Sequence, residues 1–286
     1  MSFSTRRTFL AYAGAAVLAP SARSQKRAPV GLMAYAMRQE LENDMAAALK
    51  AIAKMGYDGI EFWAPYFFWT PAYAKEVRAR MDDLNIKCLS THNESLAFSP
   101  DGLSQAIDLN KILGSQSIVA ARGLVSAVNP NHGFEGMGLD GWKRLAATFQ
   151  RTAERVRAVN MTCGFHNHTV EFQPIEGKRP IDVLAGVTEL VFHLDVSPCR
   201  QAEVDPVAFM EQYPGRTHSV LCSDWPANRN KHQPLLGDGK ENWKQLFAKA
   251  ESVGGLRFYL IQQETSDLPM TEAVQKDLER FRALHP

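Results

Sequence analysis

Short apolar runs alternate with amphipathic segments along most of the chain, and the alternation occurs eight times. The apolar runs have the length of buried strands, and the segments between them have the periodicity of helices. We expect strands at residues 30–35, 59–62, 87–92, 117–121, 162–168, 191–196, 217–224 and 258–264. We expect helices at residues 41–55, 72–84, 103–113, 141–159, 181–186, 206–212, 243–253 and 270–284.

Strands that alternate with helices at this spacing predict a parallel sheet, because each helix carries the chain back across the sheet. Eight such units without an obvious linker match a single closed (β/α)8 TIM barrel of the α/β class. A doubly wound open sheet is the alternative, but such sheets usually carry a glycine-rich phosphate loop after the first strand. Tyr35-Ala36-Met37-Arg38 follows the first strand here, so the barrel is favoured. A long loop is predicted at residues 122–138.

Residues 1–24 have a different character and are set apart from the barrel. Arg6 and Arg7 precede an apolar run at 11–19, and Ala22-Arg23-Ser24 provides a small-x-small cleavage site. This segment resembles a twin-arginine signal peptide, which predicts a periplasmic or exported protein whose mature barrel spans residues 25–286. The apolar run is too short to span a bilayer, so we expect no membrane association after cleavage.

Composition and charge narrow the classes of partner. The 286 residues are 45% hydrophobic and 22% charged, an ordinary composition for a globular protein. Loss of the leader removes three arginines and no acidic residue, which changes the formal charge from +1 to −2. A near-neutral domain lacks the basic surface of a nucleic-acid-binding protein. The sequence leaves open whether the protein is a monomer or a homo-oligomer.

The four cysteines, at positions 88, 163, 199 and 222, do not indicate a metal site or a disulfide framework. Their spacing is not that of metal ligands, and four are too few to staple a chain of this length. Three of them fall in predicted strands. We therefore expect buried, inert thiols.

Polar side chains occupy the C-terminal ends of six of the eight predicted strands. They are Glu61, His92, His166 with His168, His193 with Asp195, Asp224, and Gln262 with Glu264. A barrel carries its active site at this end of its strands. The pattern therefore predicts a polar pocket for a small molecule at one rim of the barrel.

The sequence Phe165-His166-Asn167-His168, followed by Glu171, is the densest of these groups. Side chains at i and i+2 of a strand leave from the same face, so His166 and His168 should project together. Glu171 should lie in the loop just beyond. Imidazole and carboxylate groups that converge at a strand end suit metal binding or proton transfer. The alternative of hydrogen-bonded structural histidines is less favoured for a cluster of this size.

An aromatic cluster at residues 62–69 follows the second strand. It has two interpretations that the sequence does not separate. The rings could pack into a loop that covers the barrel, or they could form a wall on which a sugar ring stacks. Trp63 is the candidate of this cluster for substrate contact.

The chain resembles the xylose isomerase-like barrels that include sugar phosphate isomerases and epimerases, and within them the exported branch. The resemblance covers essentially the whole mature chain. Its most specific part is residues 165–172, and it extends to 30–38, 55–62, 194–195, 205–207, 213–216, 236–239 and 259–264. It implies an enzyme that abstracts a proton next to the carbonyl of a sugar or keto-sugar.

The resemblance also implies a divalent metal (Mn, Mg, Co or Zn), with Glu171, Asp195 and Gln262 as candidate ligands. The ligand from strand five could be Glu171 or a histidine of the 166–168 cluster. Two replacements weaken this implication: residues 221–224 read Leu-Cys-Ser-Asp where the family has His-x-Lys-Asp, and Gln262 replaces a glutamate. A metal could be held weakly, the ligands could be rebuilt, or the site could work without metal.

The remaining site assignments follow from the strand ends and from the resemblance. The candidate catalytic residues are His92, His166, His168, Glu264 and Glu61. The candidate substrate contacts are Tyr35, Trp63, Asn167, His193, Asp224 and Trp225.

Three functions stay open from the sequence. The first is a sugar or keto-sugar isomerase or epimerase that acts on a small-molecule carbohydrate. The second is a 3-keto-glycoside lyase or hydrolase on the same barrel. The third is a non-catalytic sugar-binding barrel, which the replacements at Leu221 and Gln262 favour and the surviving His166, His168 and Asp195 oppose. A phosphorylated substrate is disfavoured, because no phosphate-binding glycine loop is present.

Overall fold

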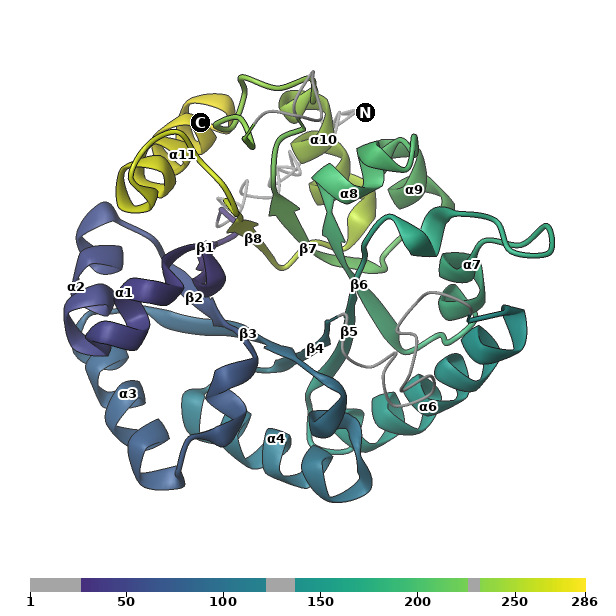
Figure 1. Ribbon diagram of the computed structural model, residues 1–286, viewed down its shortest axis with the longest axis horizontal. Coiled ribbons are helices and arrows are strands. Elements are labelled where there is room, and N and C mark those ends of the chain that lie inside the picture. Colours follow the sequence, from purple (N-terminus) through teal and green to yellow (C-terminus); the bar gives the residue numbers. More distant parts are fainter. Residues whose placement is uncertain (1–26, 122–136, 226–231) are drawn as a thin grey trace, which may run out of the picture.

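The computed structural model describes residues 27–121, 137–225 and 232–286. Eight parallel strands form a closed barrel in chain order, and the helices surround it (Figure 1). The strands are β1 (Val30–Met33), β2 (Gly59–Phe62), β3 (Lys87–Asn93), β4 (Ser117–Ala120), β5 (Thr162–His166), β6 (Leu190–Asp195), β7 (Thr217–Cys222) and β8 (Phe258–Ile261). The predicted single (β/α)8 TIM barrel is confirmed.

The helices lie on the outside of the barrel. They are α1 (Arg38–Asn43), α2 (Met45–Met55), α3 (Pro71–Asp83), α4 (Pro100–Leu113), α6 (Leu139–Arg157), α7 (Pro180–Ala185), α8 (Val196–Gln201), α9 (Pro206–Gln212), α10 (Trp243–Lys249) and α11 (Met270–Leu284). Short 3₁₀ turns η1 (Ala34–Met37), η2 (Ala64–Phe68), η3 (Ser95–Phe98) and η4 (Val170–Phe172), and a π-helical turn η5 (Ala250–Gly254), complete the set. Helices α3, α4, α7 and α9 begin with proline. Proline suits this position because it lacks a backbone N–H, and an N–H in the first turn of a helix would have no partner within the helix.

The helix predicted at residues 41–55 is in fact two helices. Asp44 separates them in an extended conformation, and its Oδ1 accepts a hydrogen bond of 2.9 Å from the backbone N–H of Ala47. Asp44 is therefore the N-cap of α2. Hydrophobic periodicity continues through this position, which explains why the prediction missed the break.

Four strands end two or three residues earlier than predicted, namely β1, β5, β7 and β8. Beyond the end of β5 a side chain takes up the backbone: the N–H of His168 donates to the side chain of Glu171 at 2.8 Å. The prediction also missed α8, which begins directly after β6 and is too short to show a helical period.

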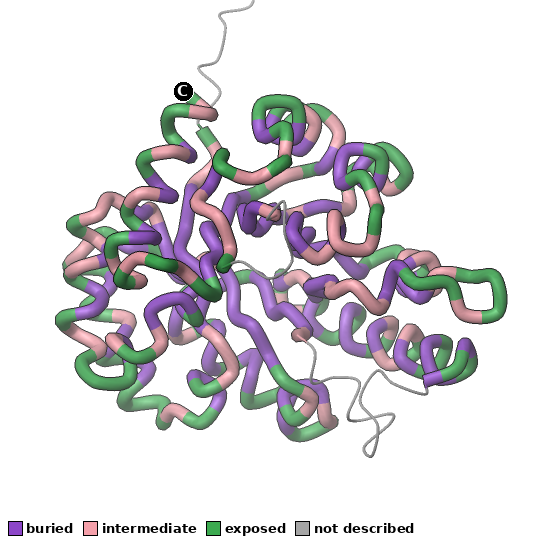
Figure 2. Tube along the Cα trace, turned by 45° about the horizontal axis from the view of Figure 1, so that its top comes forward, coloured by how far each residue is buried: buried purple, intermediate pink, exposed green. Residues whose placement is uncertain are grey.

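Buried residues follow the strands and recur along the helices around them (Figure 2). They form two apolar clusters. Large side chains between the strands and the helices, such as Trp142, Phe149 and Phe165, are almost completely buried. A separate apolar cluster of Leu221, Phe258 and Leu260 fills the barrel interior below the polar rim. This cluster borders the buried polar residues, since the ring centroids of Phe258 and His193 lie 5.5 Å apart.

All four cysteines are free and buried, which confirms the expectation of inert thiols. Burial raises the pKa of Cys88 and of Cys163 to about 12. Thiols with such pKa values remain protonated near neutral pH and are poor nucleophiles.

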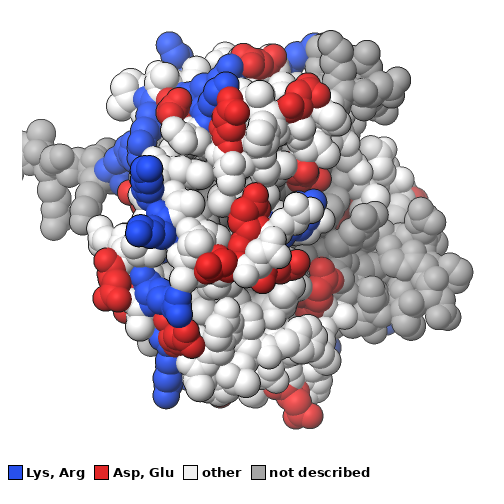
Figure 3. Space-filling model, turned by 60° about the vertical axis from the view of Figure 1, so that its left-hand side comes forward, with Lys and Arg blue, Asp and Glu red and all other residues white. Residues whose placement is uncertain are grey.

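The surface carries charges of both signs. On the face shown in Figure 3, Lys and Arg side chains lie mainly along one margin, with Asp and Glu among them and nearer the middle. Within the described residues, no helix is long and apolar enough to cross a bilayer. The predicted signal peptide at residues 1–24 and most of the predicted loop at 122–138 lie outside the described residues. Export, cleavage and cellular location therefore stay predictions.

Candidate functional site

A cavity of about 310 Å³ opens at the C-terminal end of the barrel strands. Four of its titratable side chains come from strands on different sides of the barrel: His92 from β3, His166 and His168 from the end of β5, and Glu264 from beyond β8. The other lining residues are Met33, Tyr35, Ala36, Trp63, Ala64, Glu94, Ala121, Gln262 and Gln263. Seven of the residues predicted from the sequence as site residues therefore meet at one cavity.

Three histidines form one wall of this cavity. The ring centroids of His166 and His168 lie 4.9 Å apart, and those of His92 and His166 lie 4.6 Å apart. Burial, with a smaller contribution from nearby His168, lowers the pKa of His92 to about 3. Burial, and then His92, lowers the pKa of His166 well below its usual value. Both imidazoles are therefore neutral at neutral pH, and each has a nitrogen that can accept a proton.

Glu61 lies behind the histidine wall and does not line the cavity. Its Oε1 is 3.6 Å from Nδ1 of His92, and its Oε2 is 3.5 Å from Nδ1 of His193. Burial raises the pKa of Glu61 to about 8, so the carboxyl group is protonated at neutral pH. We expected Glu61 and His193 at the cavity surface, but both are fully buried beneath it. Glu61 lies between His92 and His193 and contacts both rings.

A glycine in β5 makes room for this buried cluster. A Cβ atom on Gly164 would lie 3.0 Å from Cδ2 of His193 and 3.1 Å from a methyl group of Val119. A side chain at this position would therefore require His193 or Val119 to shift. The Gly164 before Phe165-His166 is thus part of the reason why the histidines fit inside the barrel.

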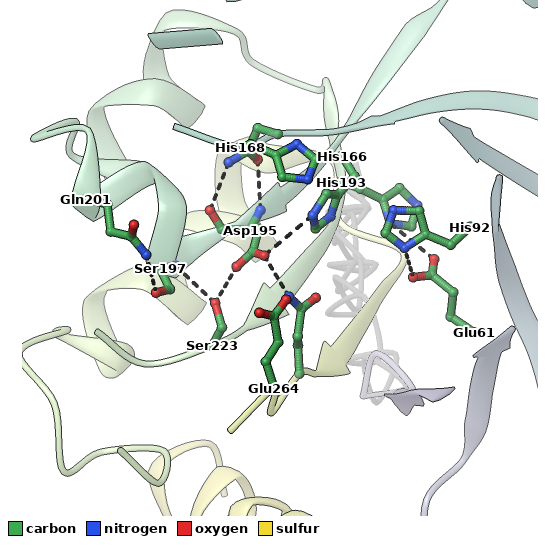
Figure 4. A network of polar contacts seen from close by, with 12 residues as sticks. Glu61, His92, His166, His168, His193, Asp195, Ser197, Gln201, Ser223 and Glu264 are labelled. Carbon is green, nitrogen blue, oxygen red and sulfur yellow. Dashed lines mark hydrogen bonds and ion pairs between the residues drawn. The ribbon is translucent and has the colours of Figure 1, made fainter. Parts of the chain in front are cut away.

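Asp195, at the end of β6, connects the histidine side of the site with the β8 side (Figure 4). The hydroxyl group of Ser223 donates to Oδ1 of Asp195, and Nε2 of Gln262 donates to Oδ2 at 2.9 Å. Nε2 of His166 lies 3.6 Å from the same Oδ2. The Gln262 amide is also 3.2 Å from Oε1 of Glu264. Burial raises the pKa of Asp195 to about 7.

Asn167 has a structural role between β5 and β6. Its Oδ1 accepts a hydrogen bond of 2.8 Å from the backbone N–H of Asp195, and its Nδ2 donates to the Asp195 carbonyl at 3.1 Å. The side chain thus continues the strand pairing past the end of β5. Asn167 was a candidate substrate contact, but it is buried and does not line either cavity at this rim. It positions its neighbours His166 and His168.

Glu171 holds His168 in place. Oε2 of Glu171 accepts the backbone N–H of His168 at 2.8 Å, and Oε1 lies 3.6 Å from Nδ1 of the same residue. The carboxylate is fully buried. The sequence placed Glu171 in the loop after the strand, and the structure confirms this position.

The residues implied as metal ligands fit a divalent cation poorly in this arrangement. Both carboxylate oxygens of Asp195 already accept hydrogen bonds from protein groups, and Gln262 turns its amide N–H toward that carboxylate. Leu221 is fully buried against other apolar side chains at the position where the resemblance places a histidine. Within the described residues, no group of three or more His, Cys, Asp or Glu side chains is arranged to hold a metal. We assign no chemical step to a metal.

A second, larger cavity lies beside the first. It has a volume of about 670 Å³, and Glu264 lines both cavities. Trp225, a candidate substrate contact, lines this larger cavity and not the smaller one. The other lining residues are Thr169, Gln173, Ser197, Gln201, Ala202, Glu203, Gln233 and Thr265.

Asp224 is an anchor for a loop and not a substrate contact. Its carboxylate accepts hydrogen bonds from the backbone N–H groups of Trp225 (2.8 Å), Gly237 (2.8 Å) and Gly239 (3.2 Å), and from Nε1 of Trp243 (2.9 Å). A Cβ atom on Gly239 would lie only 2.1 Å from the carboxylate, so this close approach requires glycine. Asp224 lines neither cavity, which corrects the expectation from the sequence.

The Asp224→Ala variant should be markedly less stable than the wild-type protein. The substitution leaves the buried indole N–H of Trp243 and backbone N–H groups without an acceptor. We expect the free energy of unfolding to fall by about 3 kcal/mol, measured by urea denaturation. Asp238→Ala is the matched control, because Asp238 lies in the same loop but is 56% exposed in its ion pair with Arg280. Equal losses in the two variants would contradict the anchoring role.

The aromatic cluster at residues 62–69 is mainly a packed loop. Phe62, Tyr66 and Phe67 are buried, and the Tyr66 hydroxyl donates to Oδ1 of Asn93 at 2.5 Å. Trp63 is half-buried and lines the smaller cavity. On the same cavity, Tyr35 is 40% exposed. Trp63 is the aromatic residue of this cluster that lines the smaller cavity, and its contact with a sugar stays a prediction.

The sequence-based assignment missed several residues of the site. Glu94 lines the smaller cavity and follows His92 at i+2, the same-face relation that pointed to His166 and His168. Ser223 binds Asp195 and occupies the position where the family pattern has lysine. Gln233, by contrast, reaches the larger cavity from a long loop, and no motif in the sequence marks it.

Comparisons with known proteins agree with this fold. The sequence profile of the xylose isomerase-like TIM barrel family matches residues 49–284. A comparison with curated proteins gave no match. A solved sugar phosphate isomerase/epimerase from Parabacteroides distasonis is similar with a TM-score of 0.73 and 22% identity, over 91% of this chain and 96% of that chain.

Two further solved structures are similar at lower identity. D-psicose 3-epimerase from Clostridium cellulolyticum H10, solved with D-tagatose, gives a TM-score of 0.69 at 14% identity, over 90% of this chain and 99% of that chain. A probable 3-DHS dehydratase from Bacillus anthracis gives 0.67 at 12% identity, over 89% and 98%. Identities this low show a common fold.

Proposed function

The chain belongs to the xylose isomerase-like TIM barrel family, and on this premise we propose that it is an isomerase- or epimerase-type enzyme for a sugar or keto-sugar. In the proposed reaction, the enzyme removes a proton from the carbon next to a carbonyl group. It then returns a proton to the same carbon or to its neighbour. The named isomerase/epimerase and epimerase among the similar structures support a reaction of this class.

One observation carries the proposal: the smaller cavity is walled by buried hydrogen-bonding atoms that lack partners. Among the described residues, Nε2 of His92, Nδ1 of His166 and Oε1 of Gln262 have none. Buried polar atoms in proteins are normally satisfied. A sugar would supply hydroxyl donors to these acceptors, and a neutral imidazole so placed can also take a proton from carbon.

The cavity also offers acid–base groups on two sides. His92 and His166 approach from β3 and β5, and Glu264 approaches from beyond β8. A base on one side of the substrate removes the proton and leaves an enediolate. A group on the other side can protonate it, as epimerisation requires. Asp195 contacts both His166 and Gln262, so it fixes the β5 side of the cavity relative to the β8 side.

The charge of the lining supports a substrate without phosphate. Among the described residues, neither cavity is lined by Lys or Arg, whereas Glu94, Glu203 and Glu264 contribute carboxylates. Such a surface repels anionic groups. We therefore propose a neutral sugar as the substrate. The signal-like leader supports the further proposal that the enzyme meets this sugar after export.

Proton NMR in D₂O tests the proposed function. The protein is incubated with a panel of ketoses and 3-keto-glucosides. We expect the C–H signal next to the carbonyl to disappear for at least one of them while the carbon skeleton is retained. Release of the leaving group would show the alternative lyase activity. Binding without any exchange would show a sugar-binding barrel and overturn the proposal.

A further inference from the structure

Apart from Glu264, the residues that line the larger cavity at the barrel rim have no part in the reaction proposed above. Its volume of about 670 Å³ is roughly twice the 310 Å³ of the cavity that holds the histidines. Volumes of a few hundred Å³ are typical of small-molecule sites. A monosaccharide bound against the histidines would leave this larger space empty.

The lining of the larger cavity suits a carbohydrate. It presents hydroxyl groups from Thr169, Ser197 and Thr265 and side-chain amides from Gln173 and Gln201. Hydroxyl and amide groups both donate and accept hydrogen bonds, which matches the hydroxyl groups of a sugar. Trp225 adds a flat aromatic face, on which the C–H face of a sugar ring can pack.

A chain of polar contacts links the two cavities (Figure 4). Nε2 of Gln201 donates to Oγ of Ser197 at 3.4 Å, and the backbone N–H of Ser197 donates to Oγ of Ser223 at 3.0 Å. Ser223 donates in turn to Asp195, which binds Gln262 in the wall of the smaller cavity. The walls of the two cavities are thus held in a fixed relation.

Glu264 lines both cavities and marks the place where they meet. A ligand with two sugar units could fill both at once, and the bond between its units would then lie beside Glu264. We propose that the larger cavity binds the second sugar unit, so that the substrate is a neutral glycoside and not a monosaccharide. This inference rests on the proposed function for the position of the reacting unit.

Calorimetric titration of matched sugars tests the inference. The probes are glucose with cellobiose and maltose, xylose with xylobiose, and mannose with mannobiose. We expect at least one disaccharide to bind 10-fold or more tightly than its monosaccharide. Trp225→Ala should remove this advantage and leave the affinity for the monosaccharide within twofold of wild type. Trp63→Ala is the reciprocal control: it should weaken the binding of both sugars to a similar extent, because Trp63 lines the smaller cavity and not the larger one.

The inference is overturned if no disaccharide binds more tightly than its monosaccharide, or if Trp225→Ala leaves the disaccharide advantage intact. Because these are binding measurements, they do not depend on turnover. If the protein favours disaccharides but exchanges no proton, the inference of a second sugar site stands and the proposed reaction is wrong. If it exchanges protons but shows no preference for disaccharides, the proposed reaction stands and the inference of a second site is wrong.

Discussion

Substitution of His166 by asparagine should lower the rate of proton exchange on the substrate by about 10²- to 10⁴-fold, the usual contribution of a positioned acid–base group. The expectation follows from three properties of His166. It lines the smaller cavity, its ring is buried and therefore neutral, and Nδ1 has no hydrogen-bond partner among the described residues. Asparagine keeps a polar group but cannot take up a proton from carbon. Deuterium incorporation in D₂O measures the rate.

A matched control separates this effect from a loss of folding. His218, at the other end of β7, is half-buried and lines neither of the rim cavities. The His218→Asn variant should exchange the substrate proton at a rate within about twofold of the wild-type rate. If His166→Asn retains more than a tenth of the wild-type rate, His166 is not the base. The base would then have to be sought in His92, His168 or Glu264.

Substitution of Glu61 by glutamine should change how stability depends on pH. Burial raises the pKa of Glu61 from 4.5 to about 8 in the folded protein. Below pH 4.5 the carboxyl is protonated in both states. Between pH 4.5 and about pH 8, Glu61 is ionised in the unfolded chain but keeps its proton in the folded protein. Wild-type stability therefore falls as pH rises, by about 1.4 kcal/mol per unit for this one group. Above pH 8 the loss stops.

The glutamine side chain does not ionise. The Glu61→Gln variant should therefore become more stable relative to the wild-type protein as the pH rises from 4.5 to 8. The difference in free energy of unfolding should grow by roughly 5 kcal/mol at most between pH 4.5 and 8. Urea denaturation at a series of pH values measures it. Glu279→Gln, at an exposed position on α11, is the control and should show a flat difference. A flat difference for Glu61→Gln would mean that Glu61 is ionised in the folded protein.

The fold was predictable because its signal is local. Each strand and helix has its own periodicity, and eight repeats of one pattern leave few topologies. The polar pocket at the barrel rim was predictable for the same reason. His166 and His168 are close together in the sequence, and most of the predicted strands end in polar residues. Capping by Asp44 was less visible, since a single side chain interrupts a continuous apolar pattern there.

The roles of the polar residues were not predictable, because they depend on partners far away in the chain. Asp195 is 28 residues from Ser223 and 67 residues from Gln262, which together occupy its carboxylate. Asp224 looked like any other polar strand end until Gly237, Gly239 and Trp243 were found around it. Glu61 looked like a catalytic carboxylate, but its burial beneath His92 leaves it protonated. Periodicity shows which face a side chain leaves from, and not what it meets.

Proton exchange by the metal-free enzyme tests the central claim most directly, namely that the protein's own imidazole and carboxylate groups move the substrate proton. The wild-type protein is treated with a chelator and desalted, and its metal content is verified. Deuterium incorporation next to the carbonyl of a keto-sugar substrate is then followed by NMR. We predict exchange at a rate within about twofold of the untreated enzyme. Loss of exchange on chelation, with recovery on addition of Mn²⁺, would contradict the account.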